Sequence, residues 1–116
     1  MDERCAVNEL IVESITADSL ANRIENNENI VMIDVREPIE LKQRIGHIDG
    51  VINIPIGKLI ANLDKLEDKK EEEIIIVCRS GSRANTAAKI MMKAGFRHPL
   101  VLMGGMLAWN IMHTNK

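Results

Sequence analysis

One cysteine of this chain stands between an apolar run and a helical pattern. The run Ile74-Ile75-Ile76-Val77 leads into the turn Cys78-Arg79-Ser80-Gly81-Ser82-Arg83. The first turn of a helix leaves backbone N–H groups without intrahelical partners, so these groups can converge on an anion. Together with the guanidinium groups of Arg79 and Arg83, they would stabilise a thiolate at Cys78. We therefore predict that Cys78 is a nucleophile and that residues 79–83 form an anion-binding loop.

Histidine is the usual partner of a nucleophilic cysteine, but none lies in this turn. The chain has three histidines, and the sequence pattern brings none of them specifically to Cys78. The loop itself must then activate the thiol. His47 is assigned to shaping the turn before Val51 rather than to chemistry.

The elements that position this loop follow from short apolar runs separated by helical patterns. Runs of four apolar residues are typical of parallel strands buried on both faces. Strand and helix alternate throughout, which predicts a three-layer α/β domain with its ligand at the carboxyl ends of the strands. The predicted strands are 30–33, 51–54, 74–77 and 100–103. The predicted helices follow a Thr16 or Asp18 cap, begin at Pro38 and end at Gly46, include Leu59 to Leu66, and run from about Ala84 to Gly95.

Two further polar residues end the strand that should lie beside the cysteine strand. The carboxylate of Asp34 has two open roles: it accepts hydrogen bonds from Arg83 or the loop N–H groups, or it forms a cap or surface pair with Arg36. Arg36 either contributes positive field at the mouth of the site or pairs with Glu37 or Glu40. We treat Asp34 and Arg36 as supporting residues, not catalytic ones.

Other residues receive structural assignments. Gly81 should have a positive φ or permit close approach to the sulfur, and Ser80 or Ser82 should cap the following helix. Trp109 and the methionines are expected to pack in the core, and the charged run 67–73 to form a solvated connection. Cys5 is a bystander thiol in an N-terminal arm of residues 1–13, and residues 14–116 form one domain.

Composition excludes several classes of function. The 116 residues carry a formal net charge of −2, and only 2% are aromatic, which argues against nucleic-acid and anionic-membrane partners. The two cysteines lack metal-ligand spacing, so neither a metal nor another cofactor is expected. The charged first stretch is unlike a signal peptide, and we expect a cytoplasmic protein.

Three motifs together resemble the rhodanese (thiosulfate sulfurtransferase) family in its single-domain form. They are the loop 78–83, the segment 33–37 with 46–55, and Gly104-Gly105-Met106-Leu107-Ala108-Trp109. The resemblance implies a rhodanese-like five-stranded, mainly parallel sheet with helices on both faces. It also implies a sulfurtransferase in which Cys78 takes sulfane sulfur as a persulfide from thiosulfate or another donor. The acceptor would be a thiol, cyanide or a sulfur-relay protein.

Two alternatives remain open. A sulfur carrier or binding module would use the same residues with little turnover of its own. A phosphatase or arsenate reductase would also place cysteine and arginine around an anion. Such phosphatases have five residues between the two, whereas four separate Cys78 from Arg83 here, which disfavours phosphoryl chemistry.

Overall fold

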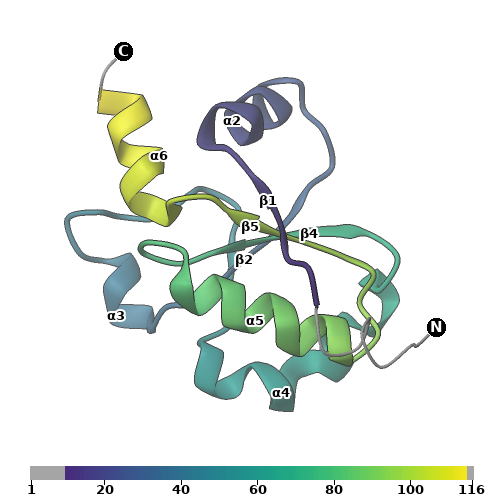
Figure 1. Ribbon diagram of the computed structural model, residues 1–116. Helices are drawn as coiled ribbons and strands as arrows, with labels where there is room; N and C mark the ends of the chain where they lie inside the picture. Colours follow the sequence, from purple (N-terminus) through teal and green to yellow (C-terminus); the bar gives the residue numbers. More distant parts are fainter. Residues whose placement is uncertain (1–9, 115–116) are drawn as a thin grey trace.

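Five parallel strands form one sheet in the order β1-β5-β4-β2-β3 in the computed structural model, which describes residues 10–114 (Figure 1). The strand that precedes the cysteine is central, with β5 and β2 as its neighbours. The strands are β1 (Glu13–Ile15), β2 (Val31–Asp34), β3 (Ile52–Asn53), β4 (Glu73–Val77) and β5 (His98–Leu102).

Helices connect these strands and cover both faces of the sheet (Figure 1). The connection between β3 and β4 contains two 3-10 helices, labelled η. The helical elements are α2 (Ala17–Glu25), α3 (Pro38–Leu41), η1 (Ile56–Lys58), α4 (Leu59–Asn62), η2 (Leu63–Lys69), α5 (Ser82–Lys93) and α6 (Gly105–Thr114).

The central strand explains why the apolar runs lack polar alternation. Side chains alternate between the two faces of a strand, and both faces of β4 are covered. Ile74 and Ile76 pack with α4 and α5, whereas Ile75 and Val77 pack with α2 and α6. The three-layer α/β architecture predicted from the sequence is therefore confirmed.

Most predicted boundaries are confirmed. Thr16 caps α2, since its Oγ1 accepts the Ser19 N–H at 3.1 Å, and Pro38 opens α3. Gly95 follows the end of α5 with the positive φ expected there, 98°. The helix predicted to end at Gly46 is shorter than expected: α3 ends at Leu41, and Gly46, with a φ of 72°, lies in the turn beyond it.

Three further expectations need correction. Strand β1 was not predicted, because two of its three residues are exposed and it lies at the sheet edge; it includes Glu13, which we assigned to the arm. The helix predicted through Leu66 changes from α to 3-10 after Asn62, whose side chain donates to the Lys58 carbonyl and competes with the helical backbone bond. Met103 is exposed rather than packed. Cys5 lies outside the described residues.

None of the helices between residues 10 and 114 combines the length and apolar character that crossing a bilayer requires.

Candidate active site

Cys78 lies at the carboxyl end of β4, where its sulfur is surrounded by backbone donors. Its Sγ accepts the Gly81 N–H at 3.0 Å and the Ala84 N–H at 3.3 Å. The residue is 1% exposed. Two amides of one turn therefore point at the sulfur, as the sequence predicted, and both interactions are stronger with a thiolate than with a thiol.

The same two bonds explain how α5 begins. Its N-cap is Gly81, with a φ of 117°, which an L side chain rarely adopts. The expected serine cap is wrong, because no side chain of the N-cap residue accepts a helical N–H. Cys78 Sγ instead accepts from Ala84, the third residue of α5, which is an amide that a capping side chain normally satisfies.

Helix α6 fixes the loop from the other side. The Met106 N–H donates to the Cys78 carbonyl at 2.8 Å, and the Leu107 N–H donates to the Arg79 carbonyl at 3.1 Å. A Cβ on Gly105 would lie 2.5 Å from both carbonyl oxygens. Only glycine permits this close approach. Gly105, in the motif 104–109, therefore allows the start of α6 to pack directly against the loop.

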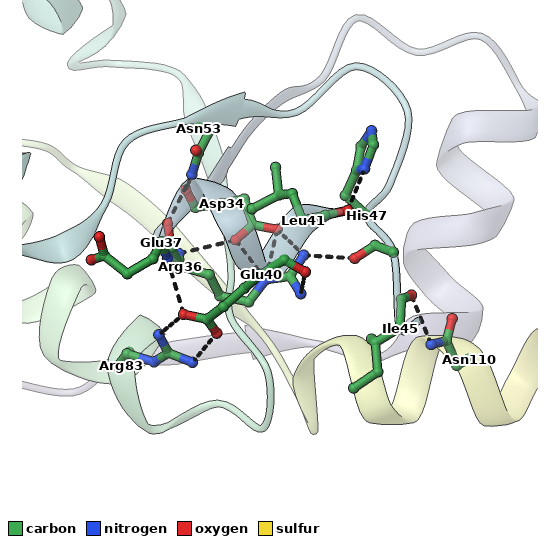
Figure 2. Close-up of polar contacts among 11 residues, drawn as sticks. Asp34, Arg36, Glu37, Glu40, Leu41, Ile45, His47, Asn53, Arg83 and Asn110 are labelled. Carbon is green, nitrogen blue, oxygen red and sulfur yellow. Dashed lines mark hydrogen bonds and ion pairs between the residues drawn. The ribbon is translucent and has the colours of Figure 1, made fainter. Parts of the chain in front are cut away.

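Arg83 is held by a carboxylate of the protein. Its Nη1 and Nη2 donate to Glu40 Oε2 and Oε1 at 2.8 and 2.9 Å, a two-pronged pair between α5 and α3 (Figure 2). The side chains are 35% and 22% exposed. Hydrogen bonding by Arg83 lowers the pKa of Glu40 from 4.5 to about 2. The carboxylate in turn raises the pKa of Arg83, so both groups stay charged near neutral pH.

A second ion pair lies in the interior beside the first. Arg36 is 1% exposed and Asp34 0%. Arg36 donates through Nη2 and Nε to Asp34 at 2.7 and 2.9 Å, and through Nη2 to the Gly46 carbonyl at 2.8 Å (Figure 2). Asn53 Nδ2 donates to the backbone carbonyls of both residues of the pair at 2.9 Å. The pair thus ties the end of β2 to β3 and to the turn that follows α3.

This geometry decides between the roles left open for the supporting residues. Asp34 pairs with Arg36, as one reading held, but the pair is buried rather than on the surface. Arg36 does not supply field at the mouth of the site, because it is enclosed and its charge is matched by Asp34. Arg36 contacts the backbone carbonyl of Glu40 at 3.5 Å and not its carboxylate. The buried guanidinium pairs instead with the carboxylate of Asp34, which lies two residues before it.

Other residues of the loop face outward. Arg79, Ser80 and Ser82 are exposed, and among residues 10–114 no ion pair is formed by Arg79. His47 Nδ1 donates to the Leu41 carbonyl at 3.2 Å, in agreement with its assignment to the turn. Trp109 packs, partly buried, against the core on the α6 side.

Sequence reasoning missed the partner of Arg83. Sequence reasoning considered Glu40 only as a partner of Arg36, which lies four residues before it. No local signal joins Glu40 to Arg83, which lies 43 residues further along the chain. In residues 10–114, no group of three or more His, Cys, Asp or Glu side chains is arranged to hold a metal ion.

Comparison with known proteins places the chain in a family. The Rhodanese-like domain family matches residues 16–112. A protein of Allochromatium vinosum named Sulfurtransferase is 30% identical over 99 residues, covering 85% of this chain and 89% of that protein. YrkF of Bacillus subtilis, named as a candidate sulfur carrier protein, is 31% identical over 107 residues, and the match covers 92% of this chain but only 56% of YrkF.

A solved structure agrees with this result. The rhodanese-like domain protein of Staphylococcus aureus superposes with a TM-score of 0.75 at 30% identity, covering 84% of this chain and 91% of that one. The chain therefore belongs to the rhodanese family, and the resemblance of its three motifs is confirmed.

Proposed function

We propose that the protein is a sulfurtransferase whose nucleophile is Cys78. The observation that carries the proposal is the pair of amide bonds to Sγ at 3.0 and 3.3 Å, in a loop between a central strand and a helix N-terminus. A thiolate held by backbone dipoles needs no neighbouring base to attack. The names of the similar proteins, a sulfurtransferase and a candidate sulfur carrier, support the same class of chemistry.

In the first half-reaction, the Cys78 thiolate attacks the outer sulfur of a donor such as thiosulfate. A bond forms between Sγ and that sulfur, while the bond to the sulfonate sulfur breaks. Sulfite leaves with the electron pair of the broken bond. The persulfide keeps one negative charge, which the loop amides stabilise as they stabilised the thiolate.

In the second half-reaction, the acceptor takes the outer sulfur. The lone pair of a thiolate or of cyanide attacks it, and the electrons of the sulfur–sulfur bond return to Sγ. This restores the Cys78 thiolate and completes a ping-pong cycle.

The two ion pairs disfavour the phosphatase alternative. A phosphate-binding loop needs its arginine to grip the oxygens of the substrate. Both terminal nitrogens of Arg83 already donate to Glu40, and Arg36 is enclosed with Asp34. The loop therefore lacks a free bidentate cation at the position where phosphoryl transfer requires one.

Turnover with thiosulfate and cyanide tests the proposal. Thiocyanate should form with the wild-type protein and not with Cys78→Ser, which keeps a similar volume but remains protonated. A wild-type protein that accepts sulfur once and turns over poorly would be a carrier, the reading that the name of YrkF favours. Equal turnover by the serine variant would reject Cys78 as the nucleophile.

A further inference from the structure

The charge around Cys78 differs from what the loop sequence suggests. Two arginines flank the cysteine in sequence, and both were expected to attract an anionic donor. The carboxylate of Glu40 cancels the charge of Arg83, and Asp34 cancels that of Arg36. Among the described residues, Arg79 is left as the loop arginine that no carboxylate matches. A dianion therefore meets a much weaker positive field than two free guanidinium groups would create.

Glu40 is also fixed in place, so Arg83 is not easily released. The Glu37 N–H donates to Glu40 Oε2 at 3.0 Å, in the capping box of α3. The Glu40 backbone carbonyl faces Nη1 of the buried Arg36 at 3.5 Å. A donor that competes for Arg83 must displace the Glu40 carboxylate, which also accepts the Glu37 N–H at the start of its own helix (Figure 2).

We infer that Glu40 is a specificity-determining residue which, by cancelling the charge of Arg83, disfavours dianionic sulfur donors and favours hydropersulfides, R–S–S–H. This inference rests on the proposed function of Cys78 and adds the class of donor. Glu40 acts through Arg83 and touches no reacting atom.

The favoured donor reaction balances without a further reactant. The Cys78 thiolate attacks the terminal sulfur of R–S–S–H, and a bond forms between Sγ and that sulfur. The bond between the two donor sulfurs breaks, and R–S⁻ leaves with its electron pair. The terminal sulfur keeps its proton as the Cys78 hydropersulfide, which becomes the persulfide anion on losing that proton. The donor brings no charge of its own, and the charge first held by Cys78 leaves on R–S⁻. Thiosulfate brings two charges to the same site and releases dianionic sulfite.

Loading of Cys78 under single-turnover conditions tests the inference. The rate of sulfur uptake is measured by intact mass with thiosulfate and with the hydropersulfide of 2-mercaptoethanol, whose carbon chain is uncharged. In Glu40→Gln, the amide oxygen still accepts the Glu37 N–H, but the charge of Arg83 is released. We expect loading by thiosulfate to become about tenfold faster and loading by the hydropersulfide to change less than about twofold.

Two further variants separate charge from structural disturbance. Glu37→Gln removes the same charge from the same helix at an exposed residue that does not touch Arg83, and should leave the ratio of the two rates unchanged. In the double variant Glu40→Gln/Arg83→Gln, the pair is again neutral, as in the wild type. The ratio should therefore return to near the wild-type value.

An unchanged donor ratio in Glu40→Gln overturns the inference, as does a double variant that behaves like Glu40→Gln alone. The proposed function fails in a different way, namely if neither donor loads the wild-type protein or if Cys78→Ser is loaded too. Loading by both donors with no response to Glu40→Gln would reject only the role of Glu40.

Discussion

Arg36 and Arg83 both lie beyond the carboxyl ends of inner strands, and each is paired with a carboxylate. The two pairs nevertheless have different roles. The Asp34–Arg36 pair is fully enclosed and joins β2, β3 and the turn after α3. The Glu40–Arg83 pair is partly exposed and joins α3 to the start of the helix that follows Cys78. The first therefore supports the architecture, and the second adjusts the charge of the site.

The difference teaches that an arginine in an anion-binding loop cannot be assigned to the substrate from its position alone. Its partner decides. Burial makes a missing partner very costly for Arg36, whereas solvent screening makes the same loss mild for Arg83. Substitutions at the two carboxylates should therefore separate stability from donor preference.

The largest effect is expected at the buried pair. Asp34→Asn leaves the Arg36 guanidinium enclosed without a matching charge, which should lower the free energy of unfolding by about 3–5 kcal/mol. Urea denaturation measures this loss. Glu40→Gln is the matched control, since it also removes one carboxylate from one arginine, and it should cost less than about 1 kcal/mol. Equal losses would contradict the distinction between the two pairs.

The next effect concerns packing that fixes the loop independently of either pair. Gly105→Ala places a Cβ against two backbone carbonyl oxygens, at a φ of 58°. We expect a loss of about 2–4 kcal/mol in unfolding free energy, together with slower loading of Cys78. Gly57→Ala is the control, because no atom lies within 4 Å of the added Cβ. A harmless Gly105→Ala would mean that the pairs, and not α6, hold the loop.

A smaller effect is expected from the cysteine itself. Cys78→Ala removes the acceptor of the Gly81 and Ala84 amides, which should lower the unfolding free energy by about 1 kcal/mol. Cys78→Ser retains an acceptor and should lose less stability, although both variants should lose sulfur transfer. Denaturation curves that rank serine below alanine would argue against the sulfur as a cap of α5.

The smallest effect is the pH dependence of the loop pair. The pKa of Glu40 is lowered in the folded protein to about 2 from 4.5, so its contribution to stability is present above 4.5 and is lost as the pH falls toward 2. Glu40→Gln and Arg83→Gln should both show a shallower loss of stability across this window, in denaturation measured at several pH values. An acid limb identical to that of the wild type would refute the pairing.

The sequence was sufficient for the parts of the fold that depend on local patterns. Apolar runs predicted β2 to β5, and Pro38 and Gly95 marked helix boundaries. The three motifs led to the family, which the comparisons confirmed. Strand β1 was not predicted, because an exposed edge strand of three residues has no apolar pattern.

The position of the cysteine and its loop could be predicted from the sequence, whereas the residues that contact the loop from other elements could not. The position of Cys78 between strand and helix indicated converging amides, because that geometry follows from neighbouring residues. The contacts of Arg83 with Glu40 and of Gly105 with the loop join residues distant in sequence, and side-chain pairing at such range follows only from the packed fold.

Intact mass after incubation with thiosulfate tests the central claim most directly. The account predicts that the wild-type protein gains one sulfur atom, that peptide mapping places it on Cys78 rather than Cys5, and that dithiothreitol removes it. A mass that stays unchanged while iodoacetamide still alkylates Cys78, or a sulfur atom found on another residue, would contradict the claim.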